Sequence, residues 1–133
     1  MNLGRSDDKG KLNRWANTLR RYLCTLNRMC EAVYVVEKSL FEPAEPLTVL
    51  LVFTGWTART HSMRFRDACT RLARSVVPAH IRMETCWLQA SQMQRFEECY
   101  RKWRDCLAGR LPAEMRQGLQ AEMSIMVGMA DNT

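Results

Sequence analysis

The stretch Leu47-Thr-Val-Leu-Leu-Val-Phe53 is apolar at almost every position and ends at Thr54-Gly55, which permits a tight turn. Because polar residues do not alternate with apolar ones, the run predicts a β-strand buried on both faces. A basic amphipathic segment follows, and a second run suited to a strand covers residues 81–88. This order predicts a β-α-β unit with parallel strands.

Two helices are predicted, one before and one after this second strand. The first spans residues 62–76, with Ser62 as the N-cap and Pro78 ending it. Its apolar positions are Phe65, Cys69, Leu72, Ala73 and Val76. The second spans residues 91–108, with Ser91 and Gln94 forming a capping box. Its apolar stripe contains Met93, Phe96, Tyr100, Trp103 and Leu107, and its other face pairs Glu97 with Arg101 and Glu98 with Lys102. We expect Phe96, Tyr100 and Trp103, together with Trp87, to pack this helix onto the sheet, with Trp56 near the strand end.

Upstream of this unit, the chain carries a heptad pattern typical of a long helix. The apolar positions are Leu12, Trp15, Leu19, Tyr22, Leu26, Met29 and Val33, in alternating steps of three and four. Such a seam predicts a helix that either lies on its own domain or packs as a coiled-coil strand against a partner. The faces between these positions carry Arg14, Arg20, Arg21 and Arg28.

The segment after the seam is β-branched and aromatic at its start. It favours a strand over residues 33–40, although a helix continuing to Leu40 is the alternative. Pro43 and Pro46 then indicate a turn, and Pro112 starts a last, weaker helix. The predicted fold is α+β, with a long N-terminal helix, a small mixed sheet containing the β-α-β unit, and C-terminal helices.

One domain is expected over residues 12–128. It contains the helical seam at 12–33 and a β-α-β-α core at 47–107. A flexible N-terminus at 1–11 and a flexible tail at 129–133 are expected on either side.

Bulk composition is that of a folded chain. The 133 residues are 47% hydrophobic and 26% charged, and no apolar run approaches the roughly 20 residues of a membrane helix. The six cysteines show neither C-x-x-C spacing nor a zinc-type cluster, so buried free thiols in a reducing compartment are expected. Neither membrane insertion nor a cofactor is expected, and we expect a cytoplasmic location, as part of an assembled particle.

Positive charge is concentrated in two zones of the sequence. Residues 1–30 carry seven Lys/Arg against two Asp, and residues 57–82 carry six Arg against one Asp, within a net charge of +6. These zones either meet nucleic acid or an acidic protein surface, or simply solvate the outer faces of helices.

No catalytic arrangement is apparent. His61 and His80 have no cysteine or carboxylate at ligand or triad spacing, and neither phosphate-loop motif occurs. A structural hydrogen bond is expected of His80, at the turn between helix and strand. The methionines near the C-terminus, at positions 115, 123, 126 and 129, suit either a loosely packed helix or a docking surface. We therefore expect a protein that is not an enzyme.

Three sequence blocks carry a resemblance to a known family. They are Val33–Leu40 followed by Pro43; then Trp56 and Arg59; then Pro78-Ala79-His80-Ile81 leading to Trp87-Leu88, Met93, Phe96-Glu97, Tyr100 and Trp103. In this order, over residues 30–107, the chain resembles the C-terminal region of large baseplate-like proteins of phage-tail-like contractile injection systems. The resemblance implies an assembly part that binds other subunits of a particle. Trp56, Arg59, Pro78, His80, Trp87, Phe96, Tyr100 and Trp103 are its motif residues.

The sequence thus predicts a structural module that docks through the seam, using Leu12, Trp15, Leu19, Tyr22, Leu26 and Met29 with Arg14, Arg20, Arg21 and Arg28 around them. The expected partners are other protein subunits of a larger assembly, and oligomerisation is left open. A small basic nucleic-acid-binding protein is the alternative.

Overall fold

The computed structural model describes residues 3–41 and 45–130, with side chains for residues 8–41 and 45–128. The chain forms two compact units, Met1–Glu31 and Ala32–Thr133. The sequence instead predicts one domain over residues 12–128. The heptad seam, except for Val33, therefore belongs to a unit of its own.

The first unit is a single long helix, α1, at Leu3–Met29. Helix extends through residues 3–11, where the sequence predicts a flexible end. Gly10 does not end the helix, because a glycine inside a helix costs only about 1 kcal/mol relative to alanine. The helix ends before Val33, the last residue of the expected seam, which begins a strand.

The second unit is built on a three-stranded sheet of β1 (Val33–Glu37), β2 (Thr48–Thr54) and β3 (Arg82–Leu88). The central strand β2 pairs antiparallel with β1 and parallel with β3, as predicted for the β-α-β unit. Its burial on both faces agrees with the unbroken apolar run. Strand β1 is shorter than expected, because residues 38–40 form a 3₁₀ turn, η1 (Lys38–Leu40).

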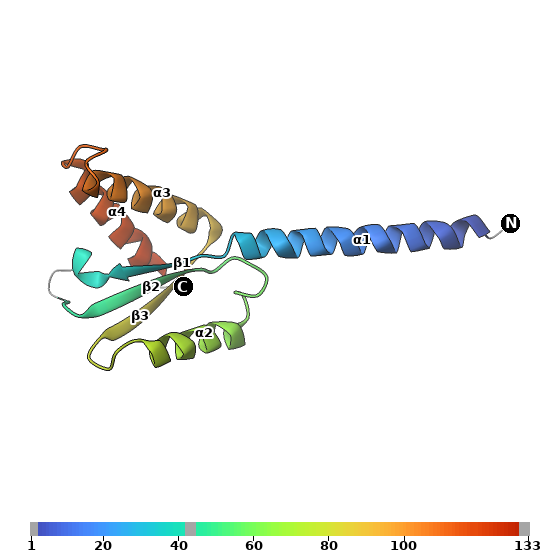
Figure 1. The fold of residues 1–133 in the computed structure, drawn as a ribbon, viewed down its shortest axis with the longest axis horizontal. Helices are drawn as coiled ribbons and strands as arrows, with labels where there is room; N and C mark the ends of the chain where they lie inside the picture. Colours follow the sequence, from blue (N-terminus) through green and yellow to red (C-terminus); the bar gives the residue numbers. More distant parts are fainter. Residues whose placement is uncertain (1–2, 42–44, 131–133) are drawn as a thin grey trace. The chain divides into compact units, whose positions relative to one another are not determined.

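Helices cover both faces of the sheet (Figure 1). Helix α2 (Met63–Val76) lies on one face, and α3 (Ala90–Leu107) and α4 (Met115–Ala130) lie on the other. The fold of the second unit is thus α+β, with all three predicted helices present. Of the expected flexible tail at 129–133, residues 129 and 130 are helical and the rest lies outside the described residues.

The face under α3 and α4, called the core face here, holds most of the hydrophobic core. The strands contribute Val36, Leu50, Val52, Cys86 and Leu88, and the helices contribute Met93, Phe96, Cys99, Cys106, Leu119, Met123, Met126 and Val127. The last helix is therefore well packed, with two of the C-terminal methionines in the core. Met115 remains exposed, and the side chain of Met129 lies outside the described residues.

The opposite face, called the α2 face, carries Val33, Val35, Leu51, Phe53 and Trp87 in register. The Phe53 and Trp87 rings stack with centroids 4.4 Å apart, and the Arg66 guanidinium of α2 lies 4.9 Å above the Trp87 ring. Trp87 therefore packs away from α3, although the sequence predicts that it helps hold that helix on the sheet. Because side chains alternate along a strand, Trp87 and its neighbour Leu88 must face opposite sides.

The helix caps differ from those predicted. The capping box of α3 is Gln89 with Gln92, two residues before Ser91 and Gln94, and Gln92 Oε1 accepts from Gln89 N at 3.0 Å. The helix starts earlier because β3 ends at Leu88, which leaves only Gln89 as a link. Ser62 does occupy the N-cap position of α2, but its side chain makes no capping hydrogen bond.

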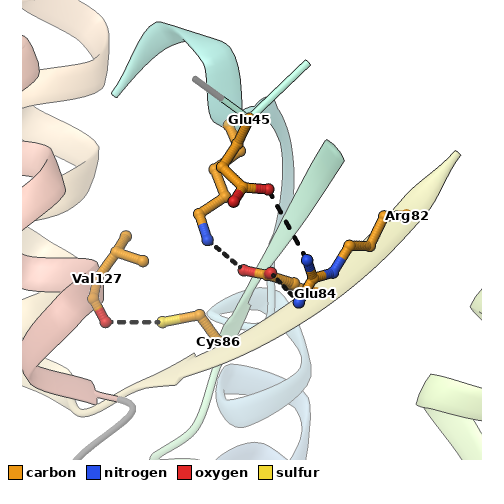
Figure 2. A network of polar contacts seen from close by, with 6 residues as sticks. Glu45, Arg82, Glu84, Cys86 and Val127 are labelled. Atoms are coloured by element: carbon orange, nitrogen blue, oxygen red, sulfur yellow. Dashed lines mark hydrogen bonds and ion pairs between the residues drawn. The ribbon is translucent and has the colours of Figure 1, made fainter. Parts of the chain in front are cut away.

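A polar network joins the start of β3 to the segments around it (Figure 2). Glu84 Oε2 accepts from Lys38 Nζ at 2.8 Å, and both side chains are half-buried. Arg82 lies 3.5 Å from Glu84 and 3.8 Å from Glu45, as dashed lines in Figure 2 mark. The Lys38–Glu84 pair thereby fixes η1, which follows one edge strand, against the other edge strand.

Candidate functional site

The predicted docking seam is an exposed apolar stripe along α1. Its members Leu12, Trp15, Leu19, Tyr22, Leu26 and Met29 have exposed fractions between 39% and 77%. In the described part of the first unit, residues 3–31, α1 is the only element, so no second element within that range packs on the stripe. The helix thus brings all six predicted apolar residues onto one face.

Leu23 belongs to the same stripe and is missing from the predicted set. It is 50% exposed and lies four residues after Leu19 and three before Leu26. In heptad terms it takes an e position beside the a/d seam, which widens the apolar surface on one side. Its helical spacing from Leu19 and Leu26 is visible in the sequence, but a pattern of strictly alternating steps of three and four does not include position 23.

The four predicted arginines of α1 are all exposed. Arg14, Arg21 and Arg28 are spaced by seven residues and form one line along the helix. At 100° per residue that line lies roughly 130° around the axis from the seam centre. The sequence interpretation assumed that the arginines border the seam directly, but they do not. Any attraction between them and a helix lying on the seam would act over a longer range.

The predicted motif residues do not gather at one site. Phe96, Tyr100 and Trp103 join Tyr34 in an aromatic cluster on the core face, with adjacent ring centroids 5.1–6.0 Å apart. Trp87 lies on the α2 face. Arg59 lies over the Phe65 ring at 4.9 Å, Trp56 is half-buried, and Pro78 and His80 are exposed. The motif residues therefore lie at separate positions, some packed and some exposed.

Trp103 is half-buried at the margin of the core, and its indole Nε1 is a buried donor that has no hydrogen-bond partner among the described residues. Such a donor loses its hydration without compensation. Tyr100 is half-buried beside it, and Phe96 is fully buried. The predicted packing of these three residues onto the sheet is present.

The two histidines are both exposed. The hydrogen bond expected of His80 is not seen: within the described residues its imidazole makes none. The strand start is instead held by backbone bonds, from Arg82 N to Leu47 O at 2.9 Å and from Ile81 N to Pro78 O at 3.0 Å. The described part of the chain contains no group of three His, Cys, Asp or Glu residues placed to hold a metal ion.

The cysteines divide into exposed and buried thiols. None of the six is in a disulfide; Cys86, Cys99 and Cys106 are buried, Cys69 is intermediate, and Cys24 and Cys30 are exposed. Cys24 differs from the expected burial because it takes an f position, opposite the seam. Cys99 Sγ lies 3.4 Å from Glu122 Oε2, and burial together with that carboxylate raises the pKa of the Cys99 thiol to about 11.

An open groove of about 710 Å³ runs along α3 beside Tyr34 of β1. Tyr34 Oη donates to Glu97 Oε1 at 3.1 Å, and burial and the Glu97 charge raise the pKa of Tyr34. Glu97 is thus paired with Tyr34 and not with Arg101 as predicted. Further along, Glu98 binds Lys102 at 2.9 Å and Asp105 binds Arg110 at 2.9 Å. The groove's carboxylates are all engaged.

Comparison of the sequence with protein-family models and with curated proteins found no match. Separately, no helix in residues 3–41 and 45–130 combines the length and apolar character that crossing a membrane requires.

Proposed function

We propose that this chain is a non-catalytic assembly module that binds another protein subunit through the apolar seam of α1. The observation that carries the proposal is the exposure of Leu12, Trp15, Leu19, Tyr22, Leu26 and Met29 along one helix face. Burying one such side chain contributes about 1.5–3 kcal/mol, so covering an exposed stripe of this length with another helix strongly favours association. Exposed apolar stripes of this kind mark interaction sites.

The expected occupant is an acidic amphipathic helix of another subunit. Residues 8–29 of α1 carry six Lys/Arg and one Asp. A second copy would bring six more positive charges alongside, whereas an acidic helix would be attracted to the same seam. The seam offers a and d positions for knobs-into-holes packing with such a helix. The aromatic d positions Trp15 and Tyr22 give it two large anchors.

We further propose that the partner is a subunit of a phage-tail-like contractile particle, at its baseplate. This part of the proposal rests on the sequence resemblance over residues 30–107. The resemblance and the exposed seam point to the same class of role, since both describe a part that is held by other subunits.

Co-expression with the proteins encoded beside this chain tests the proposal. Leu19→Asp with Leu26→Asp should abolish co-purification while leaving the melting of the sheet unit unchanged. Asn17→Asp with Cys24→Asp is the matched control, because it adds the same charges at the same spacing on the opposite face of α1. Equal loss in the control, or unfolding of the sheet unit by the seam variant, would refute docking through the seam.

Nucleic-acid binding is the second candidate, favoured by the line of Arg14, Arg21 and Arg28 on α1. Phosphate contacts from three arginines would give binding that falls steeply with salt. Replacing all three with Gln should then remove binding to a duplex or single strand near 0.15 M salt, while the seam variant retains it. Weak binding that vanishes at modest salt would be ordinary charge attraction and would leave the docking proposal in place.

A further inference from the structure

We propose that the free edge of β1, together with the groove beside α3, binds an extended acidic segment of a partner protein as a fourth strand of the sheet. This site is separate from the α1 seam. Three observations carry it: the unpaired backbone of β1, two exposed valines on the same strand, and the charge of the groove.

The backbone of β1 has one bonded and one open side. The sheet order is β1-β2-β3, so β1 is an edge strand. Thr54 N donates to Ala32 O at 3.1 Å, and bonded positions alternate along an antiparallel pair. Ala32, Tyr34 and Val36 therefore bond toward β2, which leaves the N–H and C=O groups of Val33, Val35 and Glu37 directed outward. These groups are a template for strand addition.

The side chains of this edge are unusual for a strand exposed to water. Val33 and Val35 are 52% and 65% exposed on the α2 face, whereas β3, the other edge, has no exposed large hydrophobic residue. Natural edge strands usually carry charges that discourage pairing. An added strand would place its own apolar side chains beside Val33 and Val35 and would cover both.

The groove lies on the other face of the same edge. It is lined by Tyr34 and by one side of α3, including Gln94, Arg101 and Arg104. Side chains of an added strand that point to the core face would enter it, because successive side chains alternate between faces. One extended segment thus fills the groove and covers the valines at once.

The charges of the groove select the occupant. Glu97, Glu98 and Asp105 already receive a hydrogen bond or an ion pair from Tyr34, Lys102 and Arg110. Arg101 and Arg104 are exposed and make no side-chain hydrogen bond or ion pair in the described part of the chain. Carboxylates on the added strand would pair with them. The fitting segment therefore alternates acidic residues, toward α3, with β-branched residues, toward Val33 and Val35.

Binding of a capped nine-residue peptide of alternating Glu and Val to the full chain tests the site, with an alternating Lys and Val peptide as the comparison. The Glu peptide should bind more tightly by at least about tenfold. Its addition should slow hydrogen exchange at the Val35 amide, which has no strand partner, and leave exchange at the Val36 amide unchanged. Equal affinity for the two peptides, or no slowing at Val35, would overturn the proposal.

Two variant pairs separate the contributions of backbone and charge. Val35→Pro removes the outward N–H and should weaken binding at least about tenfold, whereas Val35→Thr keeps the N–H and a β-branched side chain. Arg101→Glu with Arg104→Glu should weaken it similarly, whereas the same charge change at the exposed Arg64 and Arg116, on α2 and α4, should not. Equal effects within either pair would overturn the proposal.

The remaining outcomes also decide the question. Absence of binding by the Glu peptide, with self-association that Val35→Pro abolishes, would assign the edge to a second copy of this chain and refute the proposal. Absence of both would refute it as well. Leu19→Asp with Leu26→Asp should leave peptide binding unchanged, so that failure of the seam and failure of the edge are told apart.

Discussion

At the scale of single residues, Gly55 shows how closely two backbones approach in this sheet. Its N–H donates to Leu88 O at 2.8 Å, and a Cβ at this position would lie 3.1 Å from that oxygen and 3.2 Å from Trp87 Cβ. Gly55→Ala should therefore lower the free energy of unfolding by about 1–3 kcal/mol, measured by urea denaturation. The glycine is needed for this close approach and not for a left-handed turn, since the φ of Gly55 is not positive.

Gly118→Ala is the control for that measurement, because it is expected to raise the free energy of unfolding where Gly55→Ala lowers it. Gly118 lies in α4, where an added Cβ meets nothing within 4 Å. Alanine should raise stability by about 0.5–1 kcal/mol through helix propensity alone. A Gly55→Ala protein as stable as Gly118→Ala would show that the strands separate easily.

Cys99 makes a second residue-scale prediction, on pH. Burial and Glu122 raise the pKa of its thiol from 9.0 to about 11 in the folded chain. The protonated thiol is therefore favoured by folding, and its contribution is complete below pH 9 and is lost as pH rises to about 11. Urea denaturation under reducing conditions should show a smaller loss of stability over this range in Cys99→Ala than in the parent chain. Identical losses would contradict the shift.

For single residues, the sequence predicts which side chains are buried better than it predicts which side chains contact each other. Phe96 and Trp103 were placed correctly, because an apolar stripe at helical spacing has one side to bury. The Tyr34–Glu97 bond and the Phe53–Trp87 stack join residues 63 and 34 positions apart, so local spacing holds no information about them. For the same reason the groove along α3 was not foreseen.

At the scale of elements, the most predictable strand is also the most buried. Strand β2 lies between two others, so both of its backbone edges are hydrogen-bonded, and helices cover both faces of the sheet. Its side chains are therefore buried on both sides, which explains the unbroken apolar run in the sequence. The strand begins at Thr48, one residue after the start that the apolar run predicts. Leu47 is exposed and has a φ of 61°, and an apolar pattern gives no indication of such a left-handed conformation.

Helix α1 gives the element-scale prediction. Among the described residues of its unit, α1 is the only element and packs on no other element, and isolated helices are marginal in water. In the monomer its backbone amides should exchange hydrogen much faster than those of β2 and faster than those of α3, which buries Met93 and Phe96. Hydrogen exchange followed by mass spectrometry measures this. Protection of α1 equal to that of β2 in a verified monomer would mean that its seam is already covered.

For the whole molecule, the sequence predicts the fold class and the parallel β-α-β unit but neither the order of the three strands nor the division into units. A heptad seam looks the same whether its partner is the chain's own domain or another protein, because both bury the same stripe. The short link between Met29 and Val33 carries no run of Gly, Pro or Ser that would mark a boundary. Function is less accessible still, since it depends on which partner covers the exposed surfaces.

For the whole molecule, salt dependence distinguishes a second copy of this chain from an acidic partner protein. Two α1 helices side by side would place six Lys/Arg from residues 8–29 of each chain against one another, so self-association is opposed by repulsion. Raising salt from about 0.1 M to about 1 M shortens the screening length from about 10 Å to about 3 Å and removes most of this repulsion. Sedimentation velocity should therefore show a monomer at low salt and any self-association only at high salt. An acidic partner should show the reverse, with tighter binding at low salt. Stable dimers at low salt that dissociate as salt rises would mean that opposite charges join the copies, through a surface other than two α1 helices placed side by side.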